Sequence, residues 1–169
     1  MSLTDSLLAN NDAYAKSFTG GGLALPPAKH LAVLACMDAR LDVHKILGLA
    51  EGDAHVIRNA GGVVSDDAIR SLVISQRLLG TNEIILIHHT DCGMLTFRDD
   101  DVKDEIEAEV GIRPAFALES FKDLESDVKQ SIARITANPY IPNKSSVRGF
   151  VYDVRTGRLN EVGSAVAVG

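Results

Sequence analysis

The stretch EIILIHHTDCG, residues 83–93, decides the fold prediction because it joins an apolar run to a polar turn. The run IILI is apolar at every position, which is typical of a strand buried on both faces of a parallel sheet. The six residues that follow, HHTDCG, carry two histidines, an aspartate and a cysteine. The predicted strand is EIILIHH and ends with the two histidines, so metal-ligating groups are expected at the carboxyl end of a buried strand.

Two similar runs lie upstream: HLAVLAC at residues 30–36, and AHVIRNAGG at residues 54–62. The segment 65–80 between the second and third runs predicts a helix, with Ser65 as its N-cap and Gly80 at its end. Acidic residues after Ser65 suit the positive end of the helix dipole. The order strand, helix, strand predicts right-handed crossovers and a parallel sheet.

The remaining segments complete one α/β domain over residues 1–169. Periodicity and turn residues predict helices at 3–18, 42–49, 99–110 and 123–139, and two strands joined by a Thr-Gly turn within 146–162. The fold class is therefore a mostly parallel central sheet flanked by helices, with an antiparallel edge strand at the C-terminus.

Composition narrows the function classes. Apolar residues make up 46% of the 169 residues, which is enough for a buried core, and the net charge of −6 argues against a nucleic-acid surface. No apolar run approaches the ~18–20 residues that a membrane span needs. The N-terminus has no basic region followed by an apolar stretch, so a cytoplasmic protein is expected. Two cysteines in a reducing compartment favour metal binding or catalysis over a disulfide.

Three polar segments follow the three predicted strands: CMDAR at 36–40, RNAGG at 58–62 and HHTDCG at 88–93. The carboxyl ends of parallel strands meet at one edge of a sheet, so these segments are expected to lie together. Cys36, Cys92 and one histidine would give zinc three ligands and leave its fourth position open, as catalytic sites do. Two buried thiols beside a polar turn, or a dithiol redox pair, are the alternatives.

Side-chain alternation separates the two histidines. Adjacent residues on a strand point to opposite faces, so His88 and His89 cannot both reach Cys92. The spacing favours His89 as the ligand, and His88 is expected to have a structural role on the other face.

Asp38 and Arg40 follow Cys36 at alternating positions, so a turning segment can place them together. Such a pair is usually a surface ion pair. Beside a metal, the arginine would hold the carboxylate charged and oriented, and the carboxylate would accept a hydrogen bond from a group on the metal.

Taken together, the motifs Cys-x-Asp-x-Arg, Arg-Asn-Ala-Gly and His-x-x-Cys-Gly, from about Leu31 to Gly93, resemble a β-class carbonic anhydrase of the compact prokaryotic subgroup. The resemblance implies one zinc ion per subunit, held by Cys36, His89 and Cys92. It further implies reversible hydration of carbon dioxide to bicarbonate by a zinc-bound hydroxide.

The same resemblance assigns further roles. Asp38 and Arg40 would form the catalytic dyad, and Arg58 and Gly61 would belong to the substrate cleft. Met37 stands where the family more commonly has a serine. Two histidines are candidates for a proton shuttle by residue type alone: His44 and His55.

Members of this family are homodimers or dimers of dimers, so the resemblance implies that residues 1–29, a projecting helix and a loop, pack on a partner subunit. Two alternatives stay open. Carbonyl sulfide hydrolases share this motif set, and a catalytically silent zinc-binding module would keep the ligands without turnover.

Overall fold

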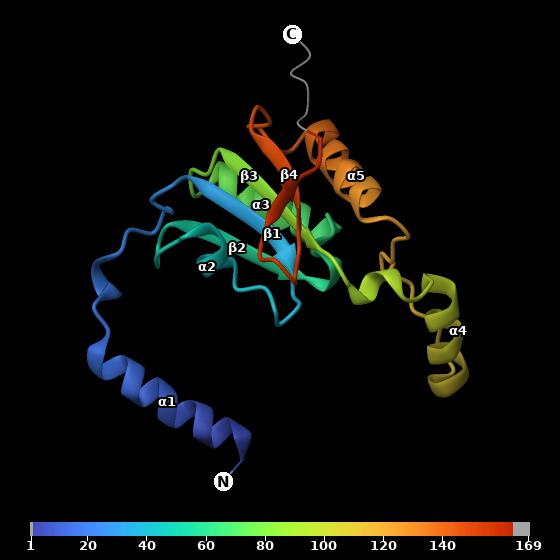
Figure 1. Cartoon of the computed structure of the whole chain (residues 1–169), viewed down its shortest axis with the longest axis horizontal. Coiled ribbons are helices and arrows are strands. Elements are labelled where there is room, and N and C mark those ends of the chain that lie inside the picture. Colours follow the sequence, from blue (N-terminus) through green and yellow to red (C-terminus); the bar gives the residue numbers. More distant parts are fainter. Residues whose placement is uncertain (1, 164–169) are drawn as a thin grey trace.

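The computed structural model describes residues 2–163, and within them five strands form one sheet in the order β2-β1-β3-β4-β5 (Figure 1). Neighbouring strands are parallel except for β4 and β5, which are antiparallel. The strands are β1 (Leu31–Cys36), β2 (Ala54–Asn59), β3 (Glu83–His89), β4 (Val147–Tyr152) and β5 (Leu159–Glu161). The predicted fold class is confirmed. Residues 1 and 164–169 of the predicted domain lie outside the described residues.

The sheet changes winding direction at β1, because β2 lies on one side of β1 and β3 on the other. Cys36 is in register with Asn59 of β2, and Ala35 is in register with Ile87 of β3. All three strands therefore end at one edge, where open α/β sheets bind their ligands.

Alternation along β1 divides the core between the two faces of the sheet. Ala32 and Leu34 belong to the apolar cluster that contains α3 and α5, whereas Val33 and Ala35 belong to the cluster that contains α2. All four side chains are fully buried, which explains why every position of this run is apolar. The helices that pack on the sheet are α2 (Val43–Leu47), α3 (Asp66–Arg77) and α5 (Leu124–Ala137).

Helix α3 starts as predicted, with the Ser65 hydroxyl accepting a hydrogen bond from the Ala68 amide. It ends at Arg77, three residues before the predicted end at Gly80. Gly80 instead takes a left-handed conformation (φ +76°) in the turn that leads to β3. The glycine therefore marks the chain reversal after the helix and not its last turn.

Helices α1 (Leu3–Ser17) and α4 (Asp99–Val110) extend away from the sheet (Figure 1). Neither range contains a buried residue. The Ser2 side chain and the Asp5 side chain cap the start of α1 reciprocally. In the described part of the chain, no helix is both long enough and apolar enough to cross a membrane.

Gly62 lets the RNAGG turn approach the strand ends closely. Its φ is +70°, and a Cβ at this position would lie 2.8 Å from the Cys36 nitrogen and 2.9 Å from the Ile87 oxygen. Backbone atoms cannot move aside as a flexible side chain can. The turn after β2 is thus packed against β1 and β3 only because this residue has no side chain.

We expect Gly62→Ala to destabilise the fold by about 2–4 kcal/mol, since the new methyl group meets two backbones at a positive φ. Urea unfolding followed by circular dichroism measures this. Gly21→Ala is the control, because a Cβ there meets nothing within 4 Å, and it should change stability by less than about 0.5 kcal/mol. Equal unfolding midpoints for the two variants would contradict the packing described.

Candidate active site

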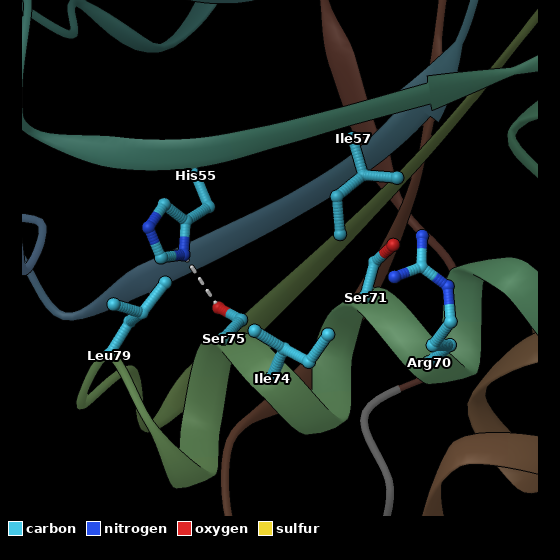
Figure 2. Close-up of a pocket in the computed structure, with 7 residues that line it drawn as sticks. All are labelled: His55, Ile57, Arg70, Ser71, Ile74, Ser75 and Leu79. Atoms are coloured by element: carbon cyan, nitrogen blue, oxygen red, sulfur yellow. Dashed lines mark hydrogen bonds between the residues drawn. The ribbon is translucent and has the colours of Figure 1, made fainter.

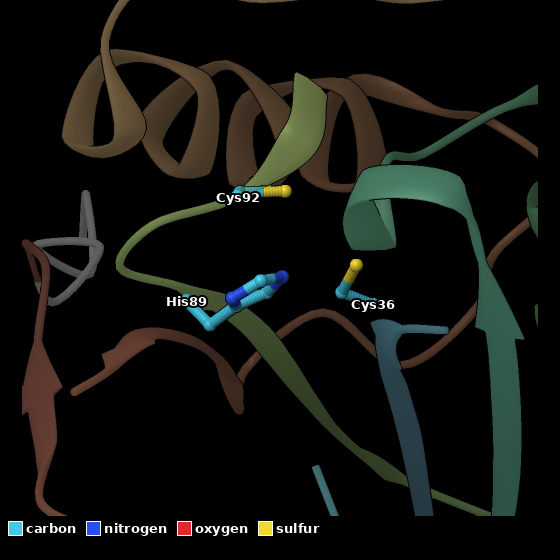
Figure 3. Close-up of side chains that lie close together, drawn as sticks. All are labelled: Cys36, His89 and Cys92. Atoms are coloured by element: carbon cyan, nitrogen blue, oxygen red, sulfur yellow. The ribbon is translucent and has the colours of Figure 1, made fainter. Parts of the chain in front are cut away.

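Three buried side chains with metal-binding atoms meet at the carboxyl edge of the sheet. Cys36 is the last residue of β1, His89 is the last residue of β3, and Cys92 precedes the short 3-10 helix η3 (Gly93–Leu95). The two sulfurs and a ring nitrogen of His89 all lie within 4.8 Å of one another. Figure 3 shows the three side chains directed toward a common space. The structure thus brings together the three ligands expected from the sequence.

The histidine ring is oriented to offer a lone pair. Nδ1 of His89 lies 2.8 Å from the carbonyl oxygen of Thr90, to which it donates, so Nε2 carries the lone pair. Nε2 is buried and has no hydrogen-bond partner among the described residues. A buried polar atom without a partner is costly, and a metal ion would satisfy it. Two thiols and one imidazole form a ligand set suited to zinc, whose ligand atoms in a tetrahedral site lie ~3.3–3.8 Å apart.

The two neighbouring thiols shift each other's pKa in opposite directions. The neighbouring Cys92 thiol, which keeps its proton, holds the pKa of Cys36 well below its usual range. The same contact raises the pKa of Cys92, because losing its proton would place two thiolates side by side. A cation bound here would displace that proton, so metal affinity should rise with pH.

Asp38 lies at the mouth of this cluster and is held by Arg40. Its Oδ1 accepts hydrogen bonds from the Arg40 backbone nitrogen (2.8 Å) and Nε (2.9 Å), and its Oδ2 accepts from Nη2 (2.8 Å). Oδ2 lies 3.7 Å from Nε2 of His89. The guanidinium keeps the pKa of Asp38 far below its usual range, so the group is a carboxylate. An ionised hydrogen-bond acceptor therefore lies beside the group formed by Cys36, His89 and Cys92.

Arg58 and Gly61 both lie beside the cluster but differ in their contacts. The Arg58 guanidinium donates to the carbonyl oxygens of Cys36 (3.0 and 2.8 Å) and Asp38 (2.7 Å), so it holds the backbone of the 36–38 segment. Gly61, with φ +82°, lines the cleft that leads to the ligands.

The cleft itself has a volume of about 320 Å³. Beyond the ligands and Asp38, apolar side chains form most of its walls: Met37, Ala60, Met94 and Phe97. Met37 and Ala60 belong to segments that the sequence places at this edge, whereas Met94 and Phe97 were not identified from the sequence. Met37 is 63% exposed and stands at the entrance. Nothing in the local sequence pattern distinguishes Met94 and Phe97 from ordinary surface or core positions.

Asp91 is a second residue that the motifs did not reveal. It lies between the ligands His89 and Cys92, and its Oδ2 accepts a hydrogen bond from Nη1 of Arg40 (2.7 Å). Its backbone is left-handed (φ +57°), a conformation that aspartate and asparagine tolerate better than most residues. That preference was the available signal for a tight turn at this position.

His88 faces away from the cluster, as alternation predicted. It is fully buried, and its Nε2 lies 2.6 Å from Oδ2 of Asp127 on α5. Its ring also lies 5.4 Å from the ring of Phe121. His88 thus links β3 to α5 on the opposite face of the sheet from His89.

The proton-shuttle candidates do not lie in the cleft. His55 lines a separate pocket of about 260 Å³ and pairs with the Ser75 hydroxyl on α3 at 2.8 Å (Figure 2). It is in register with Ala32, four residues before Cys36, which places it ~13 Å from the strand ends. His55 therefore lies toward the amino end of β2, away from the cleft. His44 is exposed on α2.

The fold and this cluster together define an α/β protein with two cysteines and one histidine that could hold a metal ion, next to a carboxylate held by an arginine. The family model described as "Carbonic anhydrase" matches residues 31–159. The chain therefore belongs to the carbonic anhydrases, and its similarity to the relatives described next places it in the β class.

Beta-carbonic anhydrase 1 of Mycobacterium tuberculosis is 63% identical over 162 residues, covering 96% of this chain and 99% of that protein. The crystal structure of the carbonic anhydrase from Streptococcus mutans superposes with a TM-score of 0.90 at 43% identity, covering 96% of this chain and 99% of that chain. A carbon disulfide hydrolase of Saccharolobus solfataricus is 36% identical, covering 81% of this chain and 79% of that protein.

We expect His89→Ala and Cys92→Ser to lose most bound zinc, because each removes one of three ligands and leaves the others too few to hold the ion. Elemental analysis of the purified proteins measures zinc per chain. His44→Ala is the matched control, since it removes an exposed histidine, and it should retain the zinc content of the unaltered protein. A Cys92→Ser protein with full zinc content would contradict the assignment of the ligands.

Proposed function

We propose that this chain catalyses the reversible hydration of carbon dioxide to bicarbonate with one zinc ion per subunit, held by Cys36, His89 and Cys92. The proposal depends on two groups that lie side by side. The three ligand atoms lie within 4.8 Å of one another, and the Asp38 carboxylate, held by Arg40, lies 3.7 Å from Nε2 of His89. A purely structural zinc site has no use for that carboxylate.

When bound, zinc supplies a Lewis acid that lowers the pKa of water, so that hydroxide is available near neutral pH. Asp38 then acts as an orienting group. An ionised carboxylate only accepts hydrogen bonds, so it fixes the remaining proton of the nucleophile and directs a lone pair toward the substrate carbon. Arg40 keeps Asp38 ionised and prevents rotation of the carboxylate, because it occupies both oxygens.

The apolar walls suit the substrate. Carbon dioxide is a small linear molecule without charge, and Met37, Met94 and Phe97 offer it an apolar surface beside the ligands. Arg58 fixes the carbonyl groups of Cys36 and Asp38. It therefore keeps the Cys36 thiol and the Asp38 carboxylate at a constant position relative to each other. Because Gly61 has no side chain, its backbone lines the cleft without taking up the cleft's volume.

Two alternative functions are less favoured. The 63% identity to proteins named beta-carbonic anhydrase 1, against 36% to a carbon disulfide hydrolase, favours carbon dioxide over carbon disulfide or carbonyl sulfide. A catalytically silent zinc-binding module would not need Asp38 and Arg40 to be paired at the ligands.

Arg40→Ala should lower kcat/KM for carbon dioxide hydration by about 10–100-fold, because Asp38 loses the contacts that orient it. Stopped-flow hydration assays on samples of equal zinc content measure this. Arg70→Ala is the matched control, since Arg70 is an exposed arginine paired with Asp67 on α3, and its activity should be unchanged.

The same unaltered enzyme should release sulfide from carbonyl sulfide or carbon disulfide far more slowly than it hydrates carbon dioxide. Faster sulfide release than hydration would replace the proposed substrate. Full activity in Arg40→Ala would instead refute the proposed role of Asp38 and Arg40 and would not affect the proposed substrate.

We further propose a homodimer, or a dimer of dimers, in which residues 1–29 pack on a partner subunit. The apolar face of α1 supports it: Leu3, Leu7 and Leu8 are 77%, 56% and 60% exposed. Such an apolar stripe on a helix without any buried residue is expected to be covered in the assembled protein. Strand β2, at the edge of the described sheet, is a second surface available to a partner.

Replacing Leu3, Leu7 and Leu8 with serine should shift the protein toward monomers at micromolar concentration, because the stripe that buries apolar area on the partner is lost. Size-exclusion chromatography with light scattering measures the mass. Serine at Asn10 and Asn11 is the control and should leave the oligomer intact. A monomeric unaltered protein, or a triple variant with unchanged mass, would contradict the proposal.

A cytoplasmic location is the last part of the proposal. It is supported by two cysteines that are both free thiols in the structure and are needed as metal ligands. Such thiols persist in a reducing compartment, whereas an oxidising one favours their conversion to a disulfide.

A further inference from the structure

Arg40 is held by two different loops. Within its own segment it binds Asp38 through Nε and Nη2. From the loop that connects the ligands His89 and Cys92, Asp91 accepts two more hydrogen bonds: its Oδ2 lies 2.7 Å from Nη1, and its carbonyl oxygen lies 3.0 Å from Nη2. All three nitrogens of the guanidinium thus have carboxylate or carbonyl partners.

We propose that Asp91 is a positioning residue, which fixes the Arg40 guanidinium and through it the orientation of the Asp38 carboxylate. This rests on the proposed function, because it assigns Asp91 to the same reaction. Arg58 holds the backbone of residues 36–38, but the paired side chains of Asp38 and Arg40 could still rotate together. Asp91 ties that pair to the end of β3, so the carboxylate keeps a constant position relative to the ligands.

The loop that carries Asp91 is itself well anchored. The Thr90 carbonyl accepts from Nδ1 of His89 (2.8 Å), and the Thr90 hydroxyl accepts from the amide of Val154 (3.1 Å), beyond β4. The backbone on the N-terminal side of Asp91 is therefore anchored, and the Asp91 carboxylate, although 77% exposed, extends from a fixed turn. An exposed ion pair normally contributes little to stability, but here its geometric restraint acts on a group beside the reacting atoms.

The left-handed backbone of Asp91 decides which variants are informative. Alanine would strain a residue with φ +57°, whereas glycine and asparagine accept that conformation. Asp91→Gly removes the side chain, and Asp91→Asn keeps an oxygen acceptor for Nη1 without the charge. Glu119→Gly is a matched control, since Glu119 is also acidic, has φ +62° and pairs with an arginine elsewhere, Arg134.

The first measurement is carbon dioxide hydration in two backgrounds. Asp91→Gly should lower kcat about 3–10-fold with KM and zinc content unchanged, and Asp91→Asn should recover much of that loss. In an Arg40→Ala background, Asp91→Gly should change kcat less than about 1.5-fold, because Arg40 is the group through which Asp91 acts. An equal loss in both backgrounds, no loss in either, or loss of zinc would overturn the proposal.

The second measurement does not depend on activity. NMR of the zinc-free protein follows solvent exchange of the Arg40 Nε–H, which Arg40→Ala identifies by its disappearance. Asp91→Gly should speed that exchange about threefold or more, and Glu119→Gly should not change it. Unchanged exchange in Asp91→Gly would overturn the proposal. If the unaltered protein hydrates no carbon dioxide while the exchange still depends on Asp91, the proposed function fails and the positioning contact stands.

Discussion

The parallel pairing of β1 with β3 is the constraint on which the site depends. It places Cys36 and His89 at the same edge of the sheet, and the register of Ala35 with Ile87 sets how far His89 extends beyond the neighbouring strand. Gly62 completes the arrangement, because its missing side chain lets the turn after β2 lie against both strand ends. Cys36 and His89 are held by a rigid buried sheet, whereas ligands carried only by loops would need further contacts to fix them.

Charge explains why the proposed function would need the Asp38–Arg40 pair beside such a cluster. Two thiolates neutralise a divalent zinc ion, which makes it a weaker Lewis acid than one held by neutral histidines. A carboxylate that orients the nucleophile compensates for part of that weakness, provided that it stays ionised and does not rotate. Arg40 meets both needs, and Arg58 holds the backbone that carries Asp38.

The strands could be predicted from local patterns, and the expected meeting of Cys36, His89 and Cys92 followed from the strand ends that carry them. Continuous apolar runs mark buried strands, and period-two alternation separates His88 from His89. The contact between Arg40 and Asp91 joins residues 51 positions apart, so no local pattern contains it. Two apolar residues of the cleft wall, Met94 and Phe97, could not be predicted either, because no periodicity links them to the strand ends. The distance of His55 from the cleft could have been predicted, because the second residue of a strand cannot lie at its carboxyl end.

X-ray absorption at the zinc edge of the purified protein tests the central claim most directly, because it reports the atoms bound to the metal. The account predicts two sulfur ligands at ~2.3 Å and nitrogen or oxygen ligands at ~2.0–2.1 Å. A zinc shell with no sulfur, or with a single sulfur, would show that Cys36 and Cys92 do not hold the ion together and would contradict the account.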